Sequence, residues 1–255
     1  MEPETSCSSP TSNPGTRSGP HDNTGMPAHG VRCLKEAGPY SVGLIERPGQ
    51  EPRTLKTWPL TLPTALKLLV GGAQAQRQLR GSRRLARLNV RTPQPIGRWT
   101  LRRHGGRWRV TIELHFAPGQ SVLDMLASGG IDERTARASA LQIGRFVRAL
   151  ANAGLTHRDL MLNNIVIEET VDGPVVWLVD TVGIRPAWGR LRRLMRMLER
   201  LFFLAAWVPV ARHRWVWAPV LREALGGLSA RDRREAFRIM RLRFRWQVST
   251  HPACG

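Results

Sequence analysis

The chain has 255 residues, of which 42% are hydrophobic, so it can bury a sizeable core and is not a protein that is disordered throughout. Its formal net charge of +20 and its pI near 11.7 favour anionic partners such as nucleic acid, a phosphorylated glycolipid or an acidic membrane leaflet. An arginine-biased composition with solvated basic faces explains the same charge equally well, because charge alone names no partner.

The cysteines and the apolar runs bear on the compartment. Cys7, Cys33 and Cys254 are scattered without a C-x-x-C pair, which favours a reducing compartment and predicts no structural zinc. The N-terminus lacks the basic-then-apolar order of a signal peptide, and the longest apolar run, residues 201–210, is too short to span a bilayer. We therefore expect a cytoplasmic protein, for which attachment at a membrane surface stays open.

The N-terminal part of the chain predicts a tail followed by a small sheet. Residues 1–29 are rich in Pro, Gly, Ser and Thr and predict a disordered tail. Short apolar runs between Gly and Pro turns predict the first strands over residues 31–57. Lys56 ends one strand, where a kinase-like fold places its phosphate-binding cation, although by itself it is equally a surface lysine. Gly38 and Gly43 flank the expected phosphate loop, but no G-x-G-x-x-G is present.

A helix, a hairpin and a linker are predicted next. Leucines and arginines are interspersed over residues 77–89 and predict a basic amphipathic helix that ends at Asn89, before a proline-containing break. Residues 99–101 and 108–116 predict a hairpin around the glycines at 105–106. The Ala-Pro-Gly at 117–119 ends this hairpin as a short linker. A linker at this place joins two lobes, with a nucleotide in the crevice beneath it.

Three further helices are predicted. Residues 132–152 form the strongest of them, with apolar residues on one face, and lead directly into residues 156–164. An amphipathic helix is predicted over 189–207 and an arginine-rich one, with a Ser cap, over 229–246. The basic face of the 189–207 helix consists of Arg192, Arg193, Arg196 and Arg200, with Trp207, Trp215 and Trp217 nearby. Either this helix packs on the core with solvated arginines, or its basic face meets anionic lipid headgroups.

Between the first and second of these helices the sequence predicts a hairpin with polar residues at its open end. The apolar runs 165–167 and 175–179 flank Asp172-Gly173, a tight-turn signal. Because an antiparallel hairpin brings its two ends together, we expect Asn164, just before the first strand, to lie beside Asp180, just after the second.

Two motifs on this hairpin indicate phosphoryl transfer. His157-Arg158-Asp159-Leu160, with Asn164 five residues after the aspartate, is the catalytic-loop pattern of protein kinases, and Asp180 with Gly183 resembles their metal-binding motif. Such a reaction needs a carboxylate at the attacking hydroxyl, oxygen ligands for magnesium and a cation for the phosphates. Asp159 would be the base, and Asn164 and Asp180 would hold the metal. The alternative is an ordinary solvated loop and a strand-end aspartate.

With these residues assembled, the chain resembles the lipopolysaccharide core kinase family, the Kdo and heptose kinases of Gram-negative envelopes. The similarity runs from about Leu55 to Trp246. Its most specific points are residues 55–56, 83–95, 113–119 and 157–160, with Asn164.

The resemblance implies an α+β, two-lobed protein-kinase-like fold. Residues 30–117 would form the nucleotide-binding lobe, a small antiparallel sheet plus a helix, and residues 118–250 the mainly helical catalytic lobe. The implied site residues are Lys56 at the ATP phosphates, Glu113 and His115 in the adenine-side linker, Asp159 as catalytic base, and Asn164 with Asp180 for Mg²⁺.

One departure from the family concerns the partner of Lys56. In related kinases a glutamate pairs with this lysine, but no Asp or Glu occurs between Glu51 and Glu113, and Gln78 aligns at that position. We expect the amide oxygen of Gln78 to accept a weaker hydrogen bond from Lys56, which predicts slow but real catalysis. Asp180 then becomes the expected carboxylate neighbour of Lys56.

The resulting hypothesis is an ATP-dependent phosphotransferase that acts on a sugar hydroxyl of the lipopolysaccharide inner core, at the inner face of the inner membrane. Its partners would be ATP, Mg²⁺ and the core glycolipid, with an anionic membrane surface permitted and no nucleic acid expected. Residues 183–189 leave no room for a long activation segment, which disfavours a peptide substrate. The alternatives are another small-molecule or protein acceptor, or an inactive pseudokinase that binds anionic partners.

Overall fold

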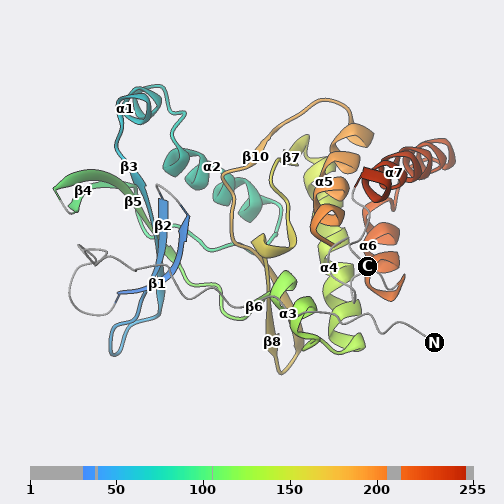
Figure 1. Cartoon of the computed structure of the whole chain (residues 1–255), viewed down its shortest axis with the longest axis horizontal. Coiled ribbons are helices and arrows are strands. Elements are labelled where there is room, and N and C mark those ends of the chain that lie inside the picture. Colours follow the sequence, from blue (N-terminus) through green and yellow to red (C-terminus); the bar gives the residue numbers. More distant parts are fainter. Residues whose placement is uncertain (1–30, 38–39, 105, 206–213, 251–255) are drawn as a thin grey trace, which may run out of the picture.

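The computed structural model describes residues 31–37, 40–104, 106–205 and 214–250. In these ranges the chain forms antiparallel sheets and seven α-helices, with a five-stranded sheet towards one end and a group of helices towards the other (Figure 1). The tail predicted for residues 1–29 and the Gly38 turn lie outside the described residues.

The five-stranded sheet is antiparallel throughout. Its order is β1 (Val31–Ala37), β2 (Tyr40–Ile45), β3 (Arg53–Pro59), β5 (Arg107–His115) and β4 (Thr100–His104). The predicted β4–β5 hairpin and a strand that carries Lys56 are therefore confirmed, but Lys56 lies in the middle of β3 and does not end it as predicted. Inward-facing residues of β3 and β5, among them Trp58 and Ile112, pack with Ala75 and Leu79 of helix α2 (Gln74–Arg87) and form a small core.

Helix α2 begins three residues earlier than predicted and is preceded by a helix that was not predicted. Gln74 starts α2 because the Gln76 side chain accepts a hydrogen bond from the Ala73 N–H and so caps the helix without a Ser or Asp. The helix ends at Arg87, and Asn89 turns the chain with a left-handed φ of 54°. The unpredicted helix is α1 (Leu62–Leu69), which Thr61 caps.

Two smaller sheets form the centre of the molecule. The predicted hairpin is confirmed as β8 (Ile165–Thr170) and β9 (Gly173–Leu178), and β6 (Gln120–Ser121) pairs with the outer side of β8. A short strand β7 (Leu155–His157) pairs with β10 (Ile184–Pro186), which brings the two segments that flank the hairpin together. Between β7 and β8 lies a single 3-10 turn, Leu162–Asn164.

The helical end consists of α3 (Val122–Ser128), α4 (Glu133–Asn152), α5 (Arg190–Ala205), α6 (Arg214–Ala224) and α7 (Ala230–Thr250). The predicted α4, α5 and α7 are confirmed within a few residues, and Asp132 and Ser229 cap α4 and α7 as their sequences indicate. Helices α3 and α6 were not predicted. The interior Pro219 of α6 is a residue that normally signals a helix end.

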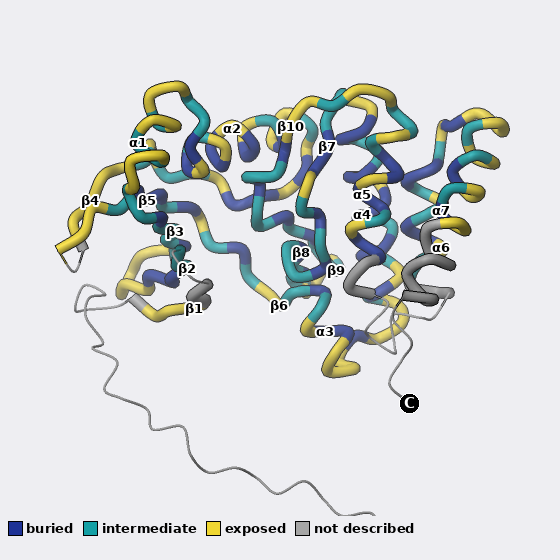
Figure 2. The backbone as a smooth tube through the Cα atoms, turned by 45° about the horizontal axis from the view of Figure 1, so that its top comes forward, coloured by how far each residue is buried: buried dark blue, intermediate teal, exposed yellow. Residues whose placement is uncertain are grey.

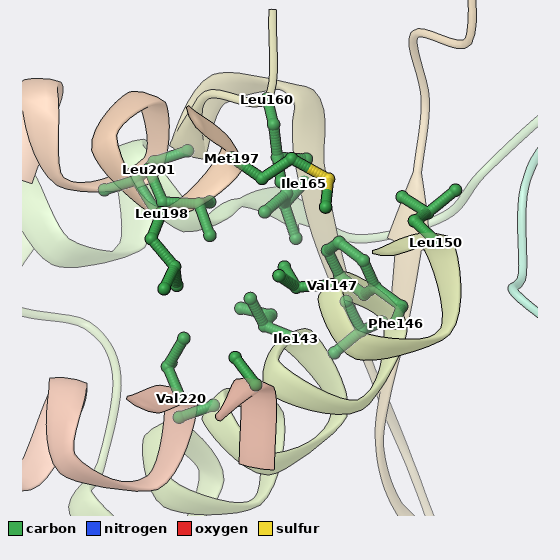
Figure 3. Close-up of a cluster of buried hydrophobic side chains, with 14 of the residues drawn as sticks. Ile143, Phe146, Val147, Leu150, Leu160, Ile165, Met197, Leu198, Leu201 and Val220 are labelled. Atoms are coloured by element: carbon green, nitrogen blue, oxygen red, sulfur yellow. The ribbon is translucent and has the colours of Figure 1, made fainter. Parts of the chain in front are cut away.

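The main core lies where α4, α5 and α6 meet the hairpin. Figure 3 shows Ile143, Val147 and Leu150 of α4 converging with side chains from α5, α6 and the segment before β8. Leu160 and Ile165, which flank the 3-10 turn, are completely buried in this core. The core therefore fixes the backbone on both sides of the turn.

Helix α5 packs on this core through Leu194, Leu198 and Leu201. Its Arg193 points inward and donates to the carbonyls of Ala151 and Ala187. Arg192, Arg196 and Arg200 are exposed, as core packing with solvated arginines predicts. Trp217 belongs to the interior instead of a lipid-facing surface, because its ring packs edge-on against Phe202 at 4.5 Å. Trp207 and the side chain of Trp215 lie outside the described residues.

The linker between β5 and α3 depends on a close approach at Gly119. This glycine has a φ of +104°, and a Cβ at this position would lie 2.0 Å from the Ile167 carbonyl oxygen in β8. Only a residue without a side chain lets the linker lie directly on the hairpin, which sets the distance between the large sheet and β8.

The fold predicts a difference between two glycines with left-handed backbones. A left-handed conformation costs an L-residue about 1–2 kcal/mol, so both Gly119→Ala and Gly97→Ala pay this cost. Gly97 has a φ of +83° with nothing within 4 Å of an added Cβ, whereas Gly119→Ala also forces Ile167 away, which should cost about 1–3 kcal/mol more. Urea denaturation of both variants measures the difference. Equal losses of stability would show that the linker does not rest on β8.

Candidate active site

The hairpin places the predicted polar residues at one edge. The Val179 N–H donates to the Asn164 carbonyl at 3.0 Å, so Asn164 lies beside the strand end that leads to Asp180, as predicted. The Asn164 side-chain nitrogen donates to the Asp159 carbonyl at 2.9 Å. Asp159, Asn164 and Asp180 therefore belong to one cluster, which the β8–β9 register fixes.

His157 joins the two motifs from inside. Its ring is completely buried, and one ring nitrogen, Nε2, lies 2.5 Å from the Asp180 carbonyl oxygen. The other, Nδ1, accepts from the Asp159 N–H at 3.2 Å. The ring is thus a neutral imidazole that donates from Nε2. Burial lowers its pKa below the ordinary 6.5, and the nearby Asp180 and Asp159 only partly offset this effect.

Asp159 combines a fixed backbone with an accessible carboxylate. The neighbouring His157 and Leu160 are both fully buried, and the Arg158 N–H donates to the Gly183 carbonyl at 3.0 Å. The Asp159 side chain itself is 49% exposed. A carboxylate held on a rigid loop and open to solvent can meet the hydroxyl of an incoming substrate.

The cluster suits a divalent cation of the magnesium type. The hydrogen bond of Asn164 uses its amide nitrogen and leaves the amide oxygen as a ligand. Asp180 accepts the Val182 N–H at one carboxylate oxygen, at 3.1 Å, and keeps the other. Within the described residues, three or more His, Cys, Asp or Glu side chains do not gather at any point. Two protein oxygens are what magnesium uses when phosphates and water complete its shell.

Lys56 reaches the same cluster from β3. Its ammonium donates to the Val179 carbonyl at 2.9 Å, which places the positive charge next to Asp180. The hydrogen bond spans from the five-stranded sheet to the hairpin. Lys56 can therefore offer a cation to a phosphate bound between these two parts of the molecule.

Gln78 makes a different contact from the one expected. Its amide oxygen accepts from the Thr181 N–H at 3.3 Å instead of from the Lys56 ammonium, and its backbone carbonyl accepts from the Thr181 hydroxyl at 2.9 Å. The side chain is fully buried, and its Nε2 has no hydrogen-bond partner among the described residues. Gln78 thus ties α2 to the residue that follows Asp180.

The contact between α2 and Thr181 extends over one turn of the helix, and we did not predict it. The Ser82 hydroxyl lies 3.2 Å from the Thr181 hydroxyl, and both residues are fully buried. A Cβ on Gly81 would lie 2.2 Å from the Thr181 carbonyl oxygen, so the helix approaches this backbone as closely as glycine permits. The sequence signal was Gly81-Ser82 inside an otherwise good helix, since a glycine there usually has a packing reason.

The residues predicted to lie beside adenine already form hydrogen bonds and ion pairs within the protein. The Glu113 carbonyl accepts from Ile96 N–H at 2.8 Å, and the His115 N–H donates to Gln94 at 2.9 Å. The Glu113 carboxylate pairs with Arg102 at 2.7 Å and with Arg53 at 3.5 Å. The Phe116 N–H also donates, to the Pro52 carbonyl at 3.2 Å, so the backbone positions open to a base follow Phe116, towards Gly119.

Comparisons with known proteins show what the chain is similar to. A sequence model of the family described as "Lipopolysaccharide kinase (Kdo/WaaP) family" matches residues 64–215. The chain is similar to the 3-deoxy-D-manno-octulosonic acid kinase of Vibrio cholerae serotype O1 (strain ATCC 39315 / El Tor Inaba N16961), with 29% identity over 118 residues, 44% of this chain and 47% of that protein. The matched part thus spans about half the length of this curated relative.

A solved structure shows the same fold over most of the chain. The structure described as "WaaP in complex with acyl carrier protein" superposes with a TM-score of 0.59 and 18% identity, and the match covers 86% of each chain.

The close approach of α2 predicts the effect of Gly81→Ala. Inside a helix, alanine is favoured over glycine by about 1 kcal/mol, but the clash with Thr181 should cost about 1–3 kcal/mol and push α2 away from Asp180. We expect a net loss of stability and weaker ATP binding, measured by thermal melting and titration calorimetry. Gly72→Ala is the matched control, because its added Cβ meets ordinary contacts at 3.6 Å or more. A Gly81→Ala protein that melts higher and binds ATP normally would contradict the contact.

The buried His157 predicts a pH dependence of stability. Its folded-state pKa is lowered, so the unfolded chain takes up the proton first as the pH falls. The free energy of unfolding should be highest above the ordinary pKa of 6.5 and fall as the pH decreases from there towards the folded-state value. Urea denaturation between neutral and mildly acidic pH measures the slope. His157→Gln, less stable throughout, should show a shallower slope, and an unchanged slope would exclude His157 as its source.

Proposed function

The chain belongs to the lipopolysaccharide kinase (Kdo/WaaP) family, and on that premise we propose that it is an ATP-dependent kinase for a sugar hydroxyl of the lipopolysaccharide inner core. The single observation that supports this most is the cluster in which Asp159, Asn164, Asp180 and Lys56 converge from separate segments. The Kdo kinase of Vibrio cholerae is the similar protein whose printed name supports a Kdo acceptor.

Each residue of the cluster has a proposed role. Asp159 accepts the proton of the sugar hydroxyl and aligns its oxygen for attack on the terminal phosphate of ATP. Lys56 binds the phosphates of the nucleotide. The Asn164 and Asp180 oxygens hold Mg²⁺, which when bound neutralises charge on the phosphates. His157 positions the other residues, since it bonds to the backbone of both Asp159 and Asp180.

The nucleotide is proposed to bind between two lobes, residues 30–117 and 118–250. The adenine-side linker predicted at Glu113 and His115 is better assigned to the backbone of residues 117–119, because the earlier N–H groups already have partners. The Phe116 N–H donates to the carbonyl of Pro52, just before β3, at 3.2 Å, and Gly119 fixes the linker on β8. Gln78 orients the segment after Asp180 and does not itself contact the phosphates.

The proposed acceptor is a sugar hydroxyl and not a peptide side chain. After Gly183, β10 ends at Pro186 and α5 starts at Arg190, which leaves no platform on which a peptide could lie beside Asp159. In the described part of the chain no helix is long and apolar enough to cross a bilayer. The proposal places the meeting with the glycolipid at the inner face of the inner membrane.

A second candidate function is an inactive pseudokinase. Gln78 occupies the position expected for an acidic partner of Lys56 and bonds to Thr181, so no carboxylate of α2 restrains the lysine. Catalytic turnover decides between the two functions.

The proposed role of Asp159 predicts a loss of activity without a loss of fold. Asp159→Ala should lower kcat about 10²–10⁴-fold, because a general base contributes roughly that factor, while thermal melting changes little because the carboxylate is half exposed. Phosphate transfer to purified deep-rough core glycolipid, followed by steady-state kinetics, measures it.

Asp172→Ala is the matched control for this variant. It removes the same charge from an exposed position at the turn of the same hairpin, away from the site, and should leave kcat unchanged. Near-normal turnover of Asp159→Ala would reject Asp159 as the base, whereas the absence of turnover in the parent chain would leave the pseudokinase.

A further inference from the structure

Helix α1 presents an apolar stripe to solvent. Leu62, Leu66 and Leu69 follow one another at i, i+4 and i+7 and are 77%, 57% and 84% exposed, and Val70 is 81% exposed. Single exposed leucines are common on proteins, but four large apolar residues within nine positions form a contiguous patch. In Figure 2, α1 stands out as exposed at one extremity of the molecule.

The exposure of this stripe does not come from a loosely attached segment. Leu68, on the opposite face of α1, packs with Leu60 against the small core around Trp58. The Gln76 side chain donates to the Leu68 carbonyl at 2.9 Å, and the Ala73 N–H donates to the Lys67 carbonyl at 3.1 Å. The helix is thus fixed at both its inner face and its C-terminal end, and the leucines of its outer face have no partner within the described chain.

The surroundings of α1 are basic. The stripe adjoins Lys67, and the exposed face of α2 consists of Arg77, Arg80, Arg83 and Arg87. The Arg80 guanidinium donates to the Gly71 carbonyl, which joins this basic face to the end of α1. In Figures 1 and 2, α1, α2 and the segment between β10 and α5 follow the same edge of the molecule.

The segment between β10 and α5 continues the same pattern. It carries the exposed Arg185 and Trp188, the latter 92% exposed, and leads into Arg192 and Arg196 of α5. No Asp or Glu occurs between Glu51 and Glu113, nor between Asp180 and Glu199, so the two segments that build this edge contain no carboxylate. An edge with leucine, tryptophan and arginine but no acidic side chain matches an interface of acyl chains and anionic headgroups.

We propose that this edge is a membrane-docking surface, on which the α1 leucines and Trp188 insert at the headgroup boundary of an anionic bilayer and the α2 arginines contact lipid phosphates. Charge complementarity selects the bilayer as the occupant, because a surface of this composition attracts anionic lipid within a Debye length of ~8–10 Å, before the apolar residues insert. Docking here would bring the proposed active site close to a substrate that is itself a lipid. The inference goes beyond the proposed kinase activity and does not require it.

The test is binding of the full chain to vesicles without nucleotide or acceptor. Leu66→Asp/Leu69→Asp changes two exposed residues of the stripe. Val171→Asp/Leu242→Asp is the matched control, with the same number of added charges at exposed apolar positions on the β8–β9 turn and on α7. Each protein is titrated with vesicles of phosphatidylglycerol and phosphatidylethanolamine and, separately, with phosphatidylcholine vesicles. Melting curves verify that all proteins are folded.

We expect the parent chain to bind the anionic vesicles at least tenfold more tightly than the neutral ones, with an affinity that falls as salt is added. Leu66→Asp/Leu69→Asp should lose at least tenfold in affinity for anionic vesicles, and the control less than threefold. Equal losses in both variants, or equal binding to both kinds of vesicle, would overturn the proposal.

Two further outcomes would assign α1 to another occupant and also overturn it. In the first, light scattering shows that the parent chain is a dimer and that Leu66→Asp/Leu69→Asp is a monomer, while this variant still binds vesicles. In the second, Leu66→Asp/Leu69→Asp binds vesicles as the parent does, but residues 1–30 of this variant become sensitive to protease, which would place that segment on the stripe. Activity on a detergent-dispersed acceptor is measured separately. Absence of this activity would contradict the kinase proposal alone, and the vesicle results would contradict the docking proposal alone.

Discussion

The contact between α2 and Thr181 is the constraint on which the site depends. It joins the five-stranded sheet, through the small core around Trp58, to the residue that follows Asp180. Buried hydrogen bonds of Gln78 and the absence of a side chain at Gly81 bring the helix against this backbone. Separating the two segments would break these buried hydrogen bonds as well as the apolar contacts, and leaving buried polar groups without partners is costly. Lys56 then reaches the Val179 carbonyl from a sheet whose position is already fixed.

The catalytic cluster could be predicted because its geometry is local. The Asp172-Gly173 turn and the apolar runs on each side specify a hairpin, and a hairpin necessarily brings its ends together. Helix α4 was predicted from its apolar face for the same reason. What could not be predicted depends on distant packing. The register of α2 against Thr181 joins residues about a hundred positions apart, so the expected Gln78 bond to Lys56 had a competitor that the sequence does not reveal. Helix α1 was missed because its leucines face solvent, against the usual pattern.

Some arginines of the chain make internal contacts and others stay at the surface, and this difference connects the chemistry of the chain to its proposed surroundings. Arg193 donates a hydrogen bond to the Ala151 carbonyl, and Arg53 and Arg102 form ion pairs with Glu113 on the sheet. Most arginines of α2 and of α5 remain at the surface; α2 contains no carboxylate, and the only one in the sequence of α5 is Glu199. A kinase for a membrane glycolipid needs affinity for an anionic interface as well as a cluster that transfers phosphate. The structure separates these two tasks, with the cluster at the hairpin and the basic, apolar edge formed by α1 and α2.

The most direct measurement of the central claim is the fate of the terminal phosphate of ATP. The chain is incubated with ATP, magnesium and purified deep-rough core glycolipid, and the glycolipid is examined by mass spectrometry before and after acid removal of its Kdo sugars. The account predicts one added phosphoryl group on the intact glycolipid that leaves with the sugar fraction, and no addition when magnesium is chelated. ATP consumption without phosphorylated glycolipid, or phosphate that remains on the lipid part, would contradict it.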